Sequence, residues 1–115
     1  MSLVYKVCSK DEWKVAIREG FFSGSAIDAR DGFIHLSTKE QLKVTVLKHF
    51  SGQKNLLIIQ FKVDKLKTKL KWEISRDNDL FPHYYGHIET NLADKVFNLD
   101  LGSNGVHEFP KNFFS

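Results

Sequence analysis

Helix-capping signals are confined to the first half of this chain, whereas the second half has the pattern of strands and turns. Ser9 stands three residues before Glu12, which is the spacing of a capping box, where each side chain bonds the backbone N–H of the other residue. This spacing predicts a helix that continues to about Gly20, because glycine is favoured just past a helix C-terminus. Its inward face is predicted to hold Trp13, Ala16 and Ile17.

A second helix is predicted to begin at residue 37 or 38 and to end near Gly52. Either Ser37 with Glu40 or Thr38 with Gln41 supplies its capping box. The residues that this helix is expected to bury are Leu42, Val46, Leu47 and Phe50. Residues 21–30, between the two helices, include a glycine flanked by serines and predict a loop.

Runs of β-branched and aromatic residues predict strands along the rest of the chain. The predicted strands cover residues 3–7, a short segment around Ile34, and residues 55–63, 70–74, 86–90 and 95–101, with a polar loop at 76–80. Asn104 and Gly105 form a turn signal that is expected to fold the last strand back on the one before it. We therefore expect residues 1–115 to form one α+β domain whose two helices both precede the strand at residue 55.

The segment from Asp31 to Thr38 is the strongest indication of a functional site. It is expected to be a short strand that runs directly into the second helix. Alternation places Phe33, His35 and Ser37 on one face, so a titratable imidazole lies beside a hydroxyl. The alternative is that His35 is a histidine at the core edge, satisfied by a backbone carbonyl.

Composition limits the function classes. The chain is 42% hydrophobic and 27% charged, without an apolar run long enough for a membrane helix, and its single Cys8 cannot form an internal disulfide. These features favour a globular protein of the reducing cytoplasm. A net charge of +3 is compatible with anionic ligands such as nucleotides and does not demand nucleic acid. The lysines between residues 62 and 71 lack interleaved aromatic residues, so the protection of a sheet edge explains them better than RNA binding does.

A second group of aromatic and histidine residues lies at positions 81–87. His83 and His87 have the spacing of two metal ligands on a helix, but Pro82 and Gly86 make a helix there unfavourable. A zinc or iron site with His35 as a third ligand is the weaker interpretation, and a metal-free pocket is preferred. Of the neighbouring tyrosines at 84 and 85, alternation predicts one for packing and one for stacking on a base.

Four separated motifs, in this order, resemble the family catalogued as domain of unknown function 952. They are Leu-Val-Tyr-Lys-Val at 3–7, Asp-Gly-Phe-Ile-His-Leu-Ser-Thr at 31–38, Lys-Trp-Glu-Ile-Ser-Arg at 71–76, and Phe-Pro-His-Tyr-Tyr-Gly at 81–86. The family is similar to the ADP-ribosyltransferase fold, which implies a split, mainly antiparallel sheet around a cleft for NAD. In that fold a residue on the first strand and a Gly-aromatic-aliphatic-x-x-Ser element grip the nicotinamide riboside, and residues 32–37 match the second element. The catalytic glutamate of many transferases has no clear counterpart, because neither Glu73 nor Glu89 lies in a matching motif.

The resemblance and the residue pattern together give a set of candidate site residues. His35 and His83 are the candidate catalytic groups. The candidate contacts for an anion, a ribose or a base are Ser37, Thr38, Arg76 and Tyr84. For Arg76 the alternative is a surface ion pair with Asp77, and Trp72 is expected in the core. Three functions stay open: an enzyme acting on a nucleotide or NAD, a non-catalytic module that binds a small molecule, and an RNA-binding protein.

Overall fold

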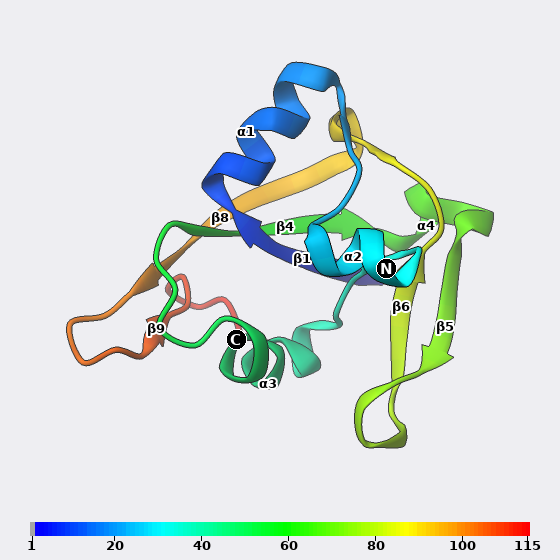
Figure 1. Ribbon diagram of the computed structural model, residues 1–115. Coiled ribbons are helices and arrows are strands. Elements are labelled where there is room, and N and C mark those ends of the chain that lie inside the picture. The colour runs from blue at the N-terminus through cyan, green and yellow to red at the C-terminus, as the bar shows by residue number, and fades with distance from the viewer. Residues whose placement is uncertain (1) are drawn as a thin grey trace.

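The main sheet of the computed structural model is four-stranded, antiparallel and ordered β1-β4-β8-β9 (Figure 1). The structure describes residues 2–115 except the side chain of Arg76. The strands of this sheet are β1 (Leu3–Ser9), β4 (Leu56–Lys62), β8 (Ala93–Leu101) and β9 (His107–Glu108). The predicted turn at Asn104 and Gly105 is confirmed, because it returns the chain so that β9 pairs with the end of β8.

Two smaller antiparallel sheets are built from the middle of the chain. One has the order β3-β6-β5, and the other pairs β2 with β7. Their strands are β2 (Phe21–Phe22), β3 (Ile34–His35), β5 (Leu70–Ile74), β6 (Leu80–Tyr84) and β7 (Ile88–Glu89). A single bridge between Tyr5 and Ser37 ties the end of β3 to β1. The predicted α+β class with mainly antiparallel pairing is therefore confirmed.

Alternating side chains of β4 fill a hydrophobic core on each face of the main sheet. Leu57, Ile59 and Phe61 pack with Trp13 and Ala16 of α1 (Lys10–Glu19). On the other face, the buried residues Leu56 and Ile58 of β4 pack with Leu42 and Val46 of α3 (Lys39–His49). Figure 1 accordingly shows α1 and α3 on opposite sides of the sheet. This arrangement requires a strand that is apolar on both faces, as the continuous run in β4 is.

The helix caps follow the predicted chemistry with one alternative excluded. Ser9 and Glu12 form the capping box of α1. Thr38 and Gln41, not Ser37 and Glu40, form the capping box of α3, because Ser37 is still in the extended segment that pairs with Tyr5. Two predicted core residues were wrong: Ile17 is 56% exposed and Leu47 is 64% exposed. Each helix touches the sheet along a narrower stripe than the apolar pattern suggested.

Two further helices correct the prediction of only two. The segment 21–30, predicted as a loop, contains β2 and most of α2 (Ala26–Asp31). Ser25 and Asp28 form the capping box at the N-terminus of α2. The short α4 (Val63–Leu66) follows β4, so not all helices precede that strand. Six and four residues are too few to show an apolar period, which is why the periodicity missed them.

The β5–β6 hairpin leaves one face open. Trp72 was predicted in the core, but it is 42% exposed and pairs with Pro82 across the hairpin.

The 3₁₀ turns are η1 (Lys67–Lys69), η2 (Arg76–Asn78) and η3 (Thr90–Leu92). β5 is at the edge of its sheet and carries Lys71, whereas Lys62 ends the central strand β4, so the predicted protection of an edge applies at most to Lys71. Within the described part of the chain, no helix has the length and apolar character to cross a membrane.

Candidate functional site

A cavity of about 540 Å³ lies where β1, α2, β3, α3 and β6 meet. His35, Ser37 and His83, three of the predicted site residues, line it together. Its walls also include the apolar side chains of Ile27, Leu36, Phe50 and Phe81. A concave space of this size with a few convergent polar groups is the usual form of a small-molecule site.

One wall of the cavity is the outer edge of β1. Tyr5 exchanges two backbone hydrogen bonds with Ser37, at 2.8 and 2.9 Å, so its amide and carbonyl point away from β4. Because successive residues of an antiparallel strand alternate in this respect, Val7 also turns its backbone polar groups away from β4. Val7, like Tyr5, lines the cavity.

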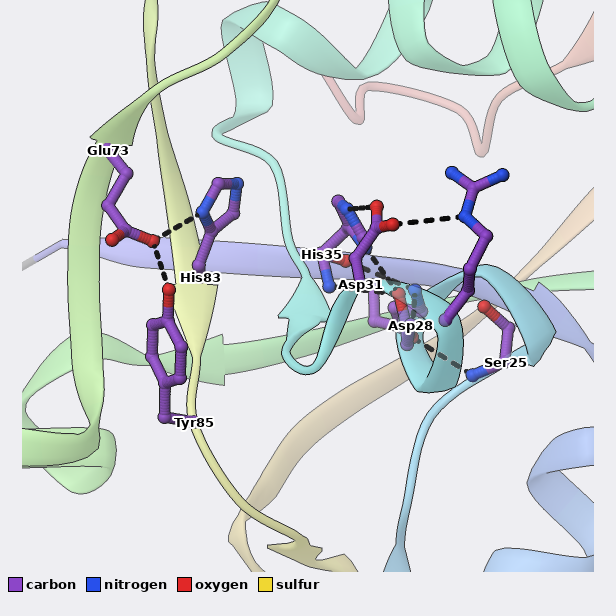
Figure 2. Close-up of polar contacts among 9 residues, drawn as sticks. Ser25, Asp28, Asp31, His35, Glu73, His83 and Tyr85 are labelled. Atoms are coloured by element: carbon purple, nitrogen blue, oxygen red, sulfur yellow. Dashed lines mark hydrogen bonds and ion pairs between the residues drawn. The ribbon is translucent and has the colours of Figure 1, made fainter.

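His35 lies between two carboxylates of α2 (Figure 2). Its Nδ1 is 2.6 Å from Asp28 Oδ1, and its Nε2 is 3.0 Å from Asp31 Oδ2. A carboxylate can only accept, so both ring nitrogens must carry a proton for both contacts to be hydrogen bonds. The arrangement therefore favours a cationic imidazole at the cavity wall.

Asp28 is the buried centre of this half of the site, with 2% of its surface exposed. Its carboxylate accepts hydrogen bonds from the backbone N–H of Ser25 at 2.9 Å and of His35 at 3.1 Å, besides the bond from the His35 ring. Burial by itself would raise the pKa of Asp28, but the hydrogen bond from His35 and the charge and hydrogen bond of Lys6 hold the pKa well below its ordinary range. Asp28 is thus a permanent anion that fixes the position of the imidazole.

Lys6 completes the buried charge network. Its ammonium lies 2.8 Å from Asp28 Oδ2 and also donates to the backbone carbonyl of His35 at 3.1 Å. Both members of this ion pair have almost fully buried side chains, 5% exposed for Lys6 and 1% for Asp28. Lys6 lines the cavity from β1 and ties that strand to α2 and β3 at once.

Gly24 makes room for Asp28. A Cβ at position 24 would lie 2.7 Å from the Asp28 Cβ, well inside contact distance, and Gly24 has a positive φ of 105°. Both observations require glycine at this position. The local sequence Gly-Ser-x-x-Asp thereby places a carboxylate under β3 and directs it at His35.

His83 is held by a third carboxylate, that of Glu73 on β5. Its Nδ1 lies 2.7 Å from Glu73 Oε1, and the same oxygen accepts a 2.7 Å bond from the Tyr85 hydroxyl. The hydrogen bonds from Tyr85 and His83 lower the pKa of Glu73, while the bond to Glu73 raises the pKa of Tyr85. Because a carboxylate can only accept, Nδ1 of His83 carries the proton of this bond, and Nε2 is the ring nitrogen left for a ligand.

The two histidines face one another. Their ring centroids are 5.5 Å apart in an edge-on arrangement, and Phe33 contacts both rings, stacked on His83 at 4.1 Å and tilted to His35 at 4.6 Å. Figure 2 shows Glu73 and Tyr85 on one flank of the pair, and Asp28 and Asp31 on the other. Two imidazoles, each oriented by a carboxylate, can serve as a base and an acid toward one bound molecule.

The remaining predicted residues do not join this cluster directly. Ser37 is buried in the cavity wall, where its hydroxyl lies 3.1 Å from that of Thr45. Thr38 caps α3 and does not line the cavity, and Tyr84 packs in the core on the α1 side of the sheet. The backbone of Arg76 lies in η2, but its side chain is outside the described part of the structure, so its predicted anion contact is untested.

Sequence reasoning missed Lys6, Asp28 and the pairing role of Glu73. A charged residue within the apolar strand at 3–9 was a usable signal for Lys6, because a buried lysine needs a carboxylate partner. The three-residue spacing of Ser25 and Asp28 was a signal for the short helix. Glu73 could not be assigned, because its pairing with His83 depends on the register of β5 against β6.

The segment that carries His83 and His87 is not helical, as Pro82 and Gly86 predicted. His83 lies on strand β6 and His87 in the loop after it, so the two do not share a helix. His87 packs against Phe21, with ring centroids 5.0 Å apart. Among the described side chains, no three of His, Cys, Asp or Glu are grouped as a metal site would require.

The chain is similar to CC0527 from Caulobacter crescentus. The comparison with an X-ray crystal structure of that protein gives 42% sequence identity and a TM-score of 0.89, over 93% of this chain and 94% of that chain. A solution NMR structure of CC0527 gives 43% identity and a TM-score of 0.82, over 92% and 91% of the two chains. No curated protein matches. A family model described as protein of unknown function (DUF952) matches residues 7–96, most of the length, and the chain therefore belongs to the DUF952 family.

Proposed function

We propose that this protein is an enzyme that carries out acid–base chemistry on a nucleotide-like small molecule in the cavity. The observation that supports this proposal is the pair of facing histidines, each held by a carboxylate and 5.5 Å apart in one concavity. A histidine without a function would not need a carboxylate to fix the orientation of its ring. Two oriented imidazoles within reach of one ligand are the arrangement that proton transfer requires.

The two histidines have different roles in this proposal. His83, with Nδ1 held by Glu73, acts as the general base through Nε2. His35, held between two carboxylates, is the cationic partner that stabilises negative charge or returns the proton. Asp28 and Lys6 act through His35 and are positioning residues, because they are buried behind it.

NAD is the first substrate to test, because of the resemblance to ADP-ribosyltransferases. In such a transfer, the bond between nicotinamide and the ribose carbon breaks, and nicotinamide leaves with the electron pair. An acceptor hydroxyl forms the new bond to that carbon while its proton passes to His83. The cavity volume of about 540 Å³ is in the range that holds a ligand of this size. We place the reaction in the cytoplasm because Cys8 is a free, buried thiol.

Thermal stabilisation combined with product analysis tests the proposal. NAD, ADP-ribose or AMP is expected to raise the melting temperature, because a ligand that binds only the folded state stabilises it by about 2.7 kcal/mol at one hundred times its Kd. Chromatography would then follow nicotinamide release from NAD. We expect His83→Asn to lower turnover by about a hundredfold or more, with binding of the ligand nearly unchanged.

A matched control and a milder variant make the test decisive. His87→Asn changes a histidine outside the cavity and is expected to leave turnover unchanged. Glu73→Gln keeps the shape but weakens the hold on His83, so it should lower turnover less than His83→Asn does. Stabilisation without turnover in any of these proteins would instead favour a non-catalytic binding module. No stabilisation by any of the three ligands would remove the nucleotide from the proposal.

A further inference from the structure

The two carboxylates that hold His35 differ in how firmly they are fixed. Asp28 has 1% of its side chain exposed and receives hydrogen bonds from Ser25, Lys6 and His35. Asp31 is 31% exposed, lines the cavity and ends α2. Displacing Asp28 would leave buried donors without partners, whereas Asp31 can turn into water without that cost.

Asp31 also binds a second cation at the rim. Its Oδ1 accepts from Arg30 Nε at 3.0 Å, while its Oδ2 meets His35 Nε2 at 3.0 Å. The Arg30 side chain is 71% exposed, so this part of the contact is an ion pair at the solvent boundary, where such pairs contribute little. One carboxylate therefore bridges two cationic donors at the edge of the cavity.

We propose that His35 Nε2 and Arg30 form the phosphate subsite of the cavity, and that the carboxylate of Asp31 occupies it until a phosphate-bearing ligand displaces it. The proposal rests on the function proposed above and specifies its substrate class: a nucleoside or other small organic group that carries a phosphate. A phosphate presents several acceptor oxygens, so it can accept from both donors at once, as the carboxylate does.

The geometry of the subsite fits the rest of the cavity. A phosphate alone would fill little of the 540 Å³, and apolar residues such as Ile27 and Phe81 line the remaining wall. A phosphate on His35 would also lie beside His83, whose ring centroid is 5.5 Å from that of His35. The base of the proposed reaction and the anchor of the substrate are then neighbours.

Binding of AMP, inorganic phosphate and adenosine to the full chain tests the subsite. Each affinity would be measured by calorimetry or by NMR titration, with the ring signals of His35 assigned. In Asp31→Ala the competing carboxylate is gone, so AMP and phosphate should bind about three to ten times more tightly than to the unsubstituted protein. Adenosine, which has no phosphate, should bind equally to both. Phosphate is also expected to shift the His35 ring signals in both proteins.

Asp64→Ala is the matched control. Asp64 is an exposed carboxylate on α4 that does not line the cavity, so its removal changes net charge by the same amount. It should leave all three affinities unchanged. If Asp31→Ala binds AMP as weakly as Asp64→Ala does, or if phosphate shifts other residues and not His35, the subsite is refuted. Either result leaves the acid–base role of His83 standing, because His83→Asn tests that role by turnover and not by phosphate binding.

Discussion

At the scale of single residues, the site depends on charges that the fold keeps out of water. The buried Lys6–Asp28 ion pair does not contribute stability simply by existing, because desolvation of two charges offsets much of their attraction. Its value here is positional: it fixes Asp28, which in turn fixes the His35 ring. Removal of one member leaves the other as an uncompensated buried charge.

Asp28→Asn is therefore expected to lower the free energy of unfolding by about 3–5 kcal/mol. The pKa of Asp28 is lowered by folding, so its contribution to stability is complete above the unfolded pKa of about 3.9 and is lost as pH falls below that value. Urea unfolding at a series of pH values should show a flatter acid limb for Asp28→Asn. Asp31→Asn, at a carboxylate that is 31% exposed, should stay within about 0.5 kcal/mol of the unsubstituted protein. A similar loss in both variants would contradict the assigned role of burial.

Cys8 offers a second test at this scale. It is fully buried on β1, and burial, followed by the nearby charge of Glu12, raises the pKa of its thiol to about 12. Because the thiolate is the reactive form, a disulfide reagent should leave the folded protein unmodified at pH 8 and react fully once urea unfolds it. Rapid modification of the folded protein would show that β1 opens far more readily than its packing implies.

At the scale of secondary-structure elements, α3 is joined to the rest of the site by its first turn. Thr38 accepts a hydrogen bond from the Gln41 N–H, and the Gln41 side chain donates to the Leu80 carbonyl at 2.8 Å and to Asp79 at 3.1 Å. One glutamine thus completes the helix cap and anchors the strand that holds His83. The position of the histidine therefore depends on the first turn of α3.

Thr38→Ala is expected to lower the free energy of unfolding by about 1 kcal/mol through loss of the cap. Gln41→Ala should lower the free energy of unfolding further, because it also leaves the Leu80 carbonyl without its hydrogen-bond donor and removes this tie between α3 and the β5–β6 hairpin. Chemical denaturation measures both, and Thr68→Ala, at a threonine of η1 that caps no helix, is the control. Equal losses in the two α3 variants would mean that the tie to the hairpin contributes nothing.

The elements also show what the sequence could and could not predict. Capping boxes and a continuous apolar run identified α1, α3 and β4, because these signals are local. His35 and Ser37 both line the cavity, but so does Leu36, which alternation places on the other face, so alternation alone did not define the wall. The partners of the histidines could not be predicted in the same way. Glu73 reaches His83 through strand register, and Asp28 reaches His35 through a short helix with no apolar period.

At the scale of the whole molecule, β4 belongs to both hydrophobic cores. Ile58 and Ile59 are neighbours in sequence, are both fully buried, and point to opposite faces of the main sheet. Because β4 contributes to both cores, loss of packing on one face of the sheet would also loosen the strand that supports the other face. We therefore expect residues 1–115 to unfold as one unit.

Ile58→Ala and Ile59→Ala should each lower the free energy of unfolding by about 2–5 kcal/mol, and each should leave a single transition. Tryptophan fluorescence, which reports Trp13 on the α1 side and Trp72 on the β5–β6 hairpin, and far-ultraviolet circular dichroism, which reports the whole chain, should give coincident curves in both variants. Separate transitions by the two probes, or a stable fragment ending near Gly52, would show two independent cores.

The Lys6–Asp28 pair also limits how this sequence can diverge over generations. A lineage that loses either charge first must survive an intermediate with the other charge buried alone, and the close contact of Gly24 with Asp28 adds a third position to that constraint. Descendants of one ancestor should therefore keep lysine, glycine and aspartate as a set or exchange them together. Position 6 is distant in sequence from positions 24 and 28, but the three are expected to change together.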